Sequence, residues 1–149
     1  MKGERSLRTD AVYRKAFAAG ERNVLPRPVG PPGNAASKAF DLSHAPAFRY
    51  SAITCNTLRI HYDADSARRE EGHSRAVQNG GLTLQLIIEA ALPHLPGRLT
   101  GFEARLTRPQ WVGDPLTVFG AAARDGRMSF WGVDREGYRC AAVEWECGA

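Results

Sequence analysis

One apolar segment, residues 82–95, constrains the fold more than any other feature of the sequence. It reads LTLQLIIEAALPHL, and its apolar residues lie nearly all round a helix rather than along one stripe. A helix of this kind has to be covered on most of its sides. It is too short to cross a membrane, and Gln85, Glu89 and Pro93 interrupt it. We therefore expect a buried helix inside a domain, and neither a membrane span nor a membrane partner.

Strand patterns follow this helix to the end of the chain. Phe102, Ala104 and Leu106 alternate with polar residues at the period of two that is typical of a strand. Three further runs predict strands over 115–122, 128–133 and 138–146, joined by a two-residue turn at Asp125-Gly126 and a longer turn over 134–137. A single long helix with one run of strands predicts an α+β fold, in which an antiparallel sheet wraps around the helix.

The segment between the N-terminus and the apolar helix is less regular. Apolar and polar residues alternate over 47–53, which predicts a strand where the domain proper begins, near Ala47. Charged residues after Ser66 predict one short helix. A weaker strand pattern lies over 11–17 and is compatible with a leading edge strand.

The basic charge of the chain belongs to its first 38 residues. They hold eight basic and three acidic residues and include the segment VLPRPVGPPGN, whereas residues 39–149 hold twelve Arg and thirteen acidic residues. The basic side chains are scattered rather than placed on one periodic face, so we expect a solvated arm and no nucleic acid partner. The sequence thus predicts an arm over 1–38 and one domain over 39–149.

The three cysteines exclude two kinds of site. Their number is odd, and their spacing matches neither a zinc site nor a redox pair, so no metal, cofactor or disulfide framework is expected. Free thiols fit a reducing compartment, and the N-terminus has no apolar signal segment. We therefore expect a cytoplasmic location.

The residues suited to chemistry lie in two segments. An imidazole (His61) and an amide (Asn56) are five residues apart, and a carboxylate (Asp63) follows two residues later. Gly80 and Gly81 open the apolar helix, where backbone N–H groups have no intrahelical acceptor. A histidine that moves a proton beside N–H donors that polarise a carbonyl is a minimal set for chemistry next to an acyl group.

The text SAITCN…RIHYD in these segments resembles the MaoC-like hydratases and dehydratases, a hotdog-fold family that acts on acyl-coenzyme A thioesters. The pattern is most similar to SALTFN…RIHYD of the mesaconyl-CoA hydratase subgroup, and the resemblance extends from about Val12 to Trp145. It implies a single hotdog, an antiparallel sheet wrapped around a long central helix, and an enoyl-CoA hydratase or 3-hydroxyacyl-CoA dehydratase activity. Coenzyme A and acyl carrier protein remain alternative carriers of the acyl group.

The resemblance also implies a role for each site residue. His61 would move protons as water adds to, or leaves, the acyl chain; Asn56 would hold that water; and the Gly80 N–H would bind the thioester oxygen. Asn56 stands where the family has Asp, and Asn79 and Leu58 stand where the subgroup often has His. Because Asn cannot carry a proton, catalysis would depend on one general acid/base.

Several of these residues also have a purely structural interpretation. Asp63 is suited to bonding the loop backbone or pairing with Arg59, and Asn79 to capping the apolar helix. Gly80 and Gly81 would be needed for the turn. Cys55 is expected to be a small, semi-buried residue. Four arginines are candidates for binding the phosphates of coenzyme A: Arg59, Arg68, Arg69 and Arg75. A solvated helix face explains Arg68 and Arg69 equally well.

Two other functions remain open at this stage. One is a hotdog subunit without chemistry that binds an acyl thioester or completes a partner's site. The other is a hotdog thioesterase, for which Glu89 is the only acidic residue of the helix and lies about two turns from its start. Because one hotdog sheet leaves an edge uncovered, we expect a homodimer or a heterodimer with a second hotdog chain.

Overall fold

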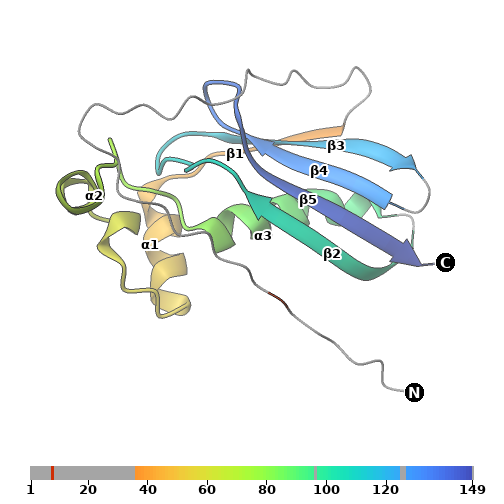
Figure 1. Cartoon of the computed structure of the whole chain (residues 1–149), viewed down its shortest axis with the longest axis horizontal. Helices are drawn as coiled ribbons and strands as arrows, with labels where there is room; N and C mark the ends of the chain where they lie inside the picture. Colours follow the sequence, from red (N-terminus) through yellow and green to blue (C-terminus); the bar gives the residue numbers. More distant parts are fainter. Residues whose placement is uncertain (1–7, 9–35, 96, 125–126, 149) are drawn as a thin grey trace.

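The computed structural model describes residues 8, 36–95, 97–124 and 127–148. Five strands form one antiparallel sheet in the order β1-β3-β4-β5-β2 (Figure 1). The strands are β1 (Ala36–Phe40), β2 (Arg98–Leu106), β3 (Leu116–Arg124), β4 (Arg127–Val133) and β5 (Arg139–Gly148). The helices are α1 (His44–Ile53), α2 (Ala64–Glu71) and α3 (Gly80–Ala91), with short 3-10 turns η1 (Arg59–His61) and η2 (Leu92–His94).

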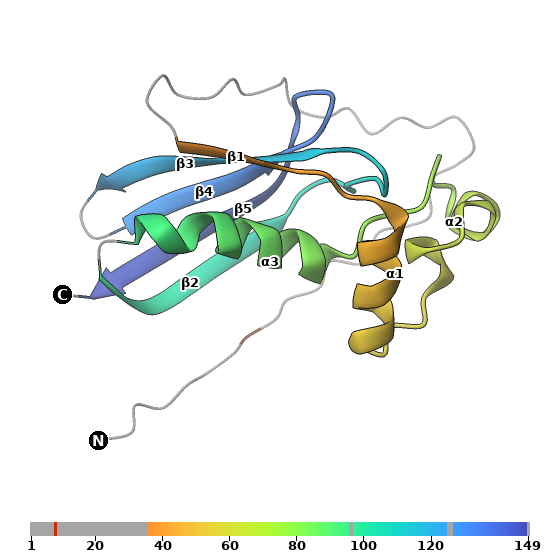
Figure 2. The same ribbon diagram turned by 180° about the vertical axis from the view of Figure 1, so that it is seen from behind.

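Helix α3 lies across one face of the sheet, which curves around it (Figure 2). Ile87 on this helix is fully buried, together with Leu116 of β3 and Trp145 of β5. Gly132 of β4 allows the close approach, because a Cβ there would lie 3.3 Å from Ile87 Cδ1. The predicted α+β arrangement, an antiparallel sheet wrapped around the apolar helix, is confirmed.

Only one side of α3 is fully enclosed. The buried residues are Thr83, Ile87, Ala90 and Ala91, whereas the leucines of this helix are half-buried. The expected cover on most sides is therefore incomplete within the described residues. No helix in these residues is long and apolar enough to span a bilayer.

The strands that follow α3 lie where the alternation predicts them. The turn between β4 and β5 is also present: Asp134 Oδ1 accepts hydrogen bonds from the N–H groups of Glu136 and Tyr138, and Gly137 has a φ of 87°. The predicted turn at residues 125–126 lies outside the described residues, as does the weak strand pattern over 11–17.

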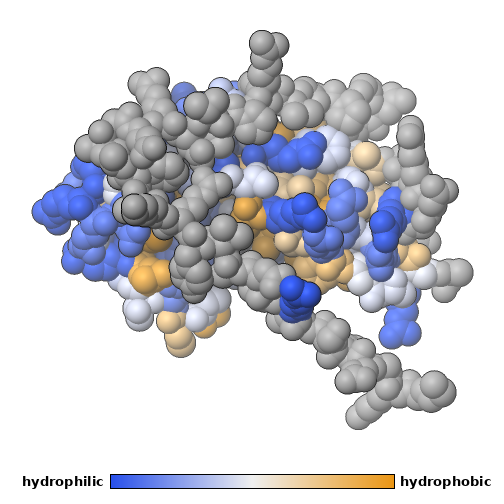
Figure 3. All heavy atoms as spheres, in the orientation of Figure 1, coloured by the Kyte–Doolittle hydropathy of each residue, from blue (hydrophilic) through white to orange (hydrophobic). Residues whose placement is uncertain are grey.

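The strand predicted over 47–53 is wrong, because these residues belong to helix α1. Ala47 and Ser51, one helical turn apart, are the buried residues of α1, while the bulky Phe48 and Ile53 are 57% and 82% exposed. The packing of these two small side chains therefore defines the buried face of α1. The alternation of apolar and polar residues with a period of two does not correspond to alternating burial in this segment. Apolar surface is exposed around this helix (Figure 3).

The first strand is instead β1, which crosses the predicted boundary between arm and domain. It pairs with β3 in a register that places Lys38 opposite Val118. Pairing with a strand about eighty residues away in sequence is a tertiary contact, which local pattern does not reveal. The predicted short helix after Ser66 is confirmed as α2, which ends at Gly72 with a φ of 72°.

Truncation of Ile87 tests the position of the core. The variant Ile87→Ala is expected to lose about 2–5 kcal/mol of unfolding free energy, because it leaves a cavity between α3 and the sheet. Urea denaturation measures this loss. The control Gln85→Ala, at an exposed position of the same helix, should change the unfolding free energy by no more than about 0.5 kcal/mol. Equal effects of the two variants would contradict the assignment of the buried face.

Candidate active site

The extended segment that leads into α3 is held on both sides by backbone hydrogen bonds. On one side the Val77 N–H donates to the Ile60 carbonyl at 2.8 Å, and on the other the Gln78 N–H donates to the Gln110 carbonyl at 2.7 Å. Val77 also forms an antiparallel bridge with Trp111. These bonds place the η1 turn and the loop after β2 at fixed positions beside the entrance of α3.

His61 ends the η1 turn and points its ring at this segment. The side chain is 7% exposed, and its Nδ1 lies 2.9 Å from the Val77 carbonyl oxygen. A carbonyl oxygen only accepts hydrogen bonds, so Nδ1 carries the proton and Nε2 keeps a lone pair. Nε2 has no hydrogen-bond partner within the described residues. This tautomer is the one required of a general base.

Asn56 follows the end of α1 and is half-buried. Its N–H donates to the Ser51 carbonyl at 2.9 Å, and its Oδ1 accepts a hydrogen bond from the Leu58 N–H at 3.2 Å. The preceding residue, Cys55, has a φ of 53° and is exposed, so the expectation that it is semi-buried is wrong. Because Oδ1 is engaged by the loop, the Asn56 side chain has its NH₂ group to offer a ligand.

The first two residues of α3 are glycines because neighbouring side chains approach them closely. A Cβ on Gly80 would lie 2.4 Å from Leu106 Cδ1, and one on Gly81 would lie 2.4 Å from Tyr50 Oη. The expected steric need for glycine is thus present, but it comes from these contacts and not from the backbone conformation of a turn, because neither glycine has a positive φ. Asn79 caps the helix, with its Oδ1 accepting the Gly81 N–H at 2.9 Å. The Gly80 N–H, in the first helical turn, is left for a ligand.

Asp63 has the structural role that the sequence allowed for it. Its Oδ1 accepts the N–H groups of Asp65 and Ser66 and so caps α2, while its Oδ2 accepts from the Arg59 guanidinium. The Ser66 backbone hydrogen bond, followed by the one from Arg59, lowers the pKa of Asp63 below its usual value. The hydrogen bond between the two side chains likewise raises the pKa of Arg59. The two side chains thus stabilise the loop that carries His61.

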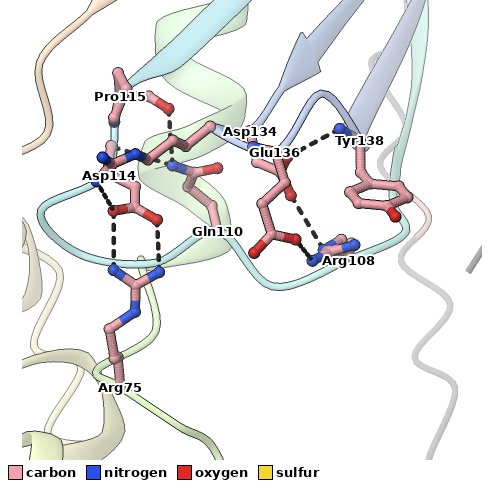
Figure 4. A network of polar contacts seen from close by, with 9 residues as sticks. Arg75, Arg108, Gln110, Asp114, Pro115, Asp134, Glu136 and Tyr138 are labelled. Carbon is pink, nitrogen blue, oxygen red and sulfur yellow. Dashed lines mark hydrogen bonds and ion pairs between the residues drawn. The ribbon is translucent and has the colours of Figure 1, made fainter. Parts of the chain in front are cut away.

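Arg75 is committed to a polar network around the loop after β2 (Figure 4). Its guanidinium donates to both carboxylate oxygens of the buried Asp114, at 2.9 and 2.6 Å. Gln110 Nε2 donates to the Asp114 and Pro115 carbonyls, which closes this loop on itself. The network fixes the loop that pairs with Gln78, and Arg75 therefore has a structural role.

The structure brings most of the predicted site residues to one end of α3. His61 is bonded to Val77, three residues before Gly80, and Asn79 caps the same helix. Glu89 lies elsewhere, paired with Lys38 at 2.7 Å on the side of the sheet edge formed by β1. Of the other arginines, Arg68 pairs with Asp65 on the exposed face of α2, as a solvated helix face predicts.

Sequence reasoning missed Tyr50, Gln78 and Gln110. Tyr50 lies in the segment 47–53, and the strand predicted there gave its side chain a different direction from the one it has on helix α1. Gln78 is buried, and both its amide atoms lack a partner within the described residues. No grouping of three or more His, Cys, Asp or Glu suited to a metal ion occurs in the described part of the chain.

Fold and site together define a hotdog protein with its candidate chemistry at the start of the central helix. A solved structure of the (R)-hydratase PhaJ1 from Pseudomonas aeruginosa matches 76% of this chain and 78% of its own, with a TM-score of 0.65 and 24% identity. The ChsH1-ChsH2 complex from Mycobacterium tuberculosis matches 74% of this chain and 91% of its own, with a TM-score of 0.62 and 17% identity. At these identities the likeness concerns the fold.

Sequence comparison shows the family. The family model for hydroxyacyl-thioester dehydratase type 2 matches residues 5–112, and the chain belongs to this family. It is also 42% identical over 62 residues to the mesaconyl-C(4)-CoA hydratase of Chloroflexus aurantiacus, a match that covers 42% of this chain and 22% of that protein. The chain spans about a quarter of the length of the curated relatives it matches. The resemblance to MaoC-like hotdog hydratases and dehydratases is confirmed.

Replacement of Asp63 tests its capping role through pH. Because its pKa is lower in the folded chain than in the unfolded chain, its contribution to stability is complete above about pH 4 and is lost as the pH falls through the folded value. Asp63→Ala should therefore lower the melting temperature at pH 7, and the difference from wild type should shrink in acid. Thermal unfolding from pH 7 to pH 2 measures this, with Asp65→Ala as the control of small effect. A difference that is independent of pH would contradict the assignment.

Proposed function

We propose that the chain is an acyl-thioester hydro-lyase, which adds water to a 2-enoyl-CoA or removes it from a 3-hydroxyacyl-CoA. The observation that carries this proposal is the hydrogen bond from His61 Nδ1 to the Val77 carbonyl, at 2.9 Å. It leaves Nε2 as a base beside the entrance of α3, where Gly80 offers an N–H. Membership of the hydroxyacyl-thioester dehydratase family supports the reaction class.

In the direction of hydration, His61 Nε2 removes a proton from water while the water oxygen bonds to C3 of the enoyl group. Electrons of the C2=C3 bond move toward the thioester oxygen, where the Gly80 N–H stabilises the enolate. His61 then delivers the proton to C2, so one H and one OH are added overall. Asn56 donates from its NH₂ group to the water oxygen, because its own carbonyl oxygen accepts from Leu58. One histidine thus performs both proton transfers.

The substrate we infer is the coenzyme A thioester of a short, branched or dicarboxylic 2-enoyl acid. Two features support this class: the RIHYD text of residues 59–63, and the 42% identity to a mesaconyl-C(4)-CoA hydratase over 62 residues. A thioesterase is not adopted, because the carboxylate it would need, that of Glu89, is paired with Lys38 away from the entrance of α3.

Removal of the imidazole tests the role of His61. Both His61→Ala and His61→Gln should lower kcat by about 10²- to 10⁴-fold, the usual loss for a general acid/base. The assay follows loss of the conjugated thioester absorbance with crotonyl-CoA and with mesaconyl-CoA. His94→Gln is the matched control, since His94 is exposed at the other end of α3. Equal rates for wild type and the His61 variants would refute the assignment.

A subunit that binds acyl thioesters without turning them over is the second candidate. It is favoured by the engagement of the Asn56 carbonyl oxygen and by the absence of the family's carboxylate at this position. Binding of crotonyl-CoA without hydration, followed by hydration when a second hotdog protein is added, would select this function.

For a partner we propose a second hotdog chain on the edge of β2, either another copy or a relative. Within the described part of the chain this strand pairs with β5 alone, and its apolar side chains Leu99, Phe102 and Leu106 are 38%, 49% and 53% exposed. Exposed, long edge strands of soluble proteins are normally covered or protected. Leu106 also contacts Gly80, so a chain on this edge would lie beside the proposed active site.

A charge on this edge tests the partner surface. Phe102→Glu should convert a wild-type dimer into monomer, because a carboxylate buried between two sheets lacks a partner. Sedimentation velocity over a range of concentrations measures the assembly. The control Phe48→Glu places the same charge on an aromatic of α1 with similar exposure, 57% against 49% for Phe102, and should leave the dimer intact. A Phe102→Glu variant that still assembles would contradict the proposal, as would a wild type that stays monomeric both alone and when mixed with a second hotdog chain.

A further inference from the structure

The hydroxyl of Tyr50 lies at the entrance of α3. A Cβ built on Gly81 would be 2.4 Å from Tyr50 Oη and 3.3 Å from its Cζ, so the phenol end of the side chain meets the first turn of the helix. The same Cβ would be 3.2 Å from Asn79 Oδ1. Figures 1 and 2 show α1, which carries Tyr50, beside the N-terminal end of α3.

This hydroxyl is not used by the fold. Tyr50 is half-buried, and its Oη has no hydrogen-bond partner within the described residues. Tyr62, also near the loop, differs in this respect because its hydroxyl donates to the Thr57 carbonyl at 3.1 Å. A phenol held at a helix N-terminus with its O–H free has a donor to offer a ligand.

An oxyanion site with two donors needs one donor more than the free backbone N–H groups at the start of α3 provide. The Gly81 N–H is occupied by the capping Asn79 side chain, so the proposed site has the Gly80 N–H as its backbone donor. Sites that stabilise an oxyanion usually place more than one donor at the oxygen, since each removed donor costs about 10²- to 10³-fold in kcat. The chain therefore needs a further donor, and Tyr50 Oη is beside the occupied N–H.

We propose that Tyr50 donates a hydrogen bond to the thioester oxygen of the substrate and completes, with the Gly80 N–H, a two-donor oxyanion site. The inference rests on the proposed function, because it assigns the carbonyl oxygen of an acyl thioester as the ligand. No covalent bond to Tyr50 forms or breaks; its O–H strengthens its hydrogen bond as the enolate charge develops. The glycine at 81 then has a chemical purpose, since it leaves room for this hydroxyl.

The test compares Tyr50→Phe with wild type in turnover and in binding. With crotonyl-CoA, kcat should fall by about 10²-fold, while the ring keeps its packing and the melting temperature changes little. Binding is measured by calorimetry with crotonyl-CoA and with S-butyl-CoA, a thioether that lacks the carbonyl oxygen. Wild type should prefer the thioester, and Tyr50→Phe should lose that preference without weaker binding of the thioether. Tyr138→Phe, on the β4–β5 turn, is the control.

A second variant covers the case in which Tyr50→Phe folds poorly. Gly81→Ala retains the phenol but places a methyl group where Oη lies, so it should displace the hydroxyl and lower kcat in the same direction. The double variant should lose no more than either single variant, because both changes remove the same hydrogen bond. Additive losses would contradict a shared cause.

The outcomes separate this inference from the proposed function. If wild type hydrates or prefers the thioester and Tyr50→Phe behaves identically, the role of Tyr50 is wrong and the proposed function stands. If wild type neither hydrates crotonyl-CoA nor binds it more tightly than S-butyl-CoA, both are overturned. Loss of the thioester preference in Tyr50→Phe alone supports both.

Discussion

The backbone pairing of residues 76–78 is the constraint on which the proposed site depends. This short extended segment bonds to Ile60 on one side and to Gln110 on the other, and it leads directly into α3. The Val77 carbonyl faces the η1 turn and orients His61, whereas the Ala76 carbonyl faces the other side and accepts from the Val112 N–H. The start of the central helix and the candidate base are thus held at one place by the same few hydrogen bonds.

The helix entrance shows how a sequence change alters a site without altering the fold. Asn79 serves the structure well, because its short amide caps α3 through the Gly81 N–H. The same hydrogen bond removes that N–H from the set of donors available to a ligand. The proposed site therefore combines a single imidazole, an Asn56 whose carbonyl oxygen accepts a backbone hydrogen bond, and the hydroxyl group of Tyr50 on α1. This combination differs from one that would place an acid/base carboxylate beside the histidine.

Prediction from sequence succeeded where a long local pattern coincided with burial. The apolar segment of α3 and the alternation of β3 and β5 both reflect faces that pack in the folded chain, whereas the alternating Phe102 and Leu106 of β2 are 49% and 53% exposed. The motif around His61 indicated the family. It failed for α1, where Ala47 and Ser51 are buried and the large Phe48 is exposed. It failed for β1, because this strand is defined by its pairing with β3 and not by a local sequence pattern. It also missed Tyr50, whose direction depends on α1 being a helix.

The sequence by itself determined the class of the fold, the central helix, the presence of four strands after it and the identity of the candidate base, because these depend on local periodicity and on a short motif. The order of the strands in the sheet, with β2 beside β5, was not among them. Only the tertiary structure decided the tautomer of His61, the occupation of Asn56 and Gly81 by the fold's own hydrogen bonds, and the close approach of Tyr50 and Leu106 to the two glycines. These features arise from contacts between segments distant in the sequence. Such contacts are set by packing and hydrogen-bond geometry, which no window of neighbouring residues contains.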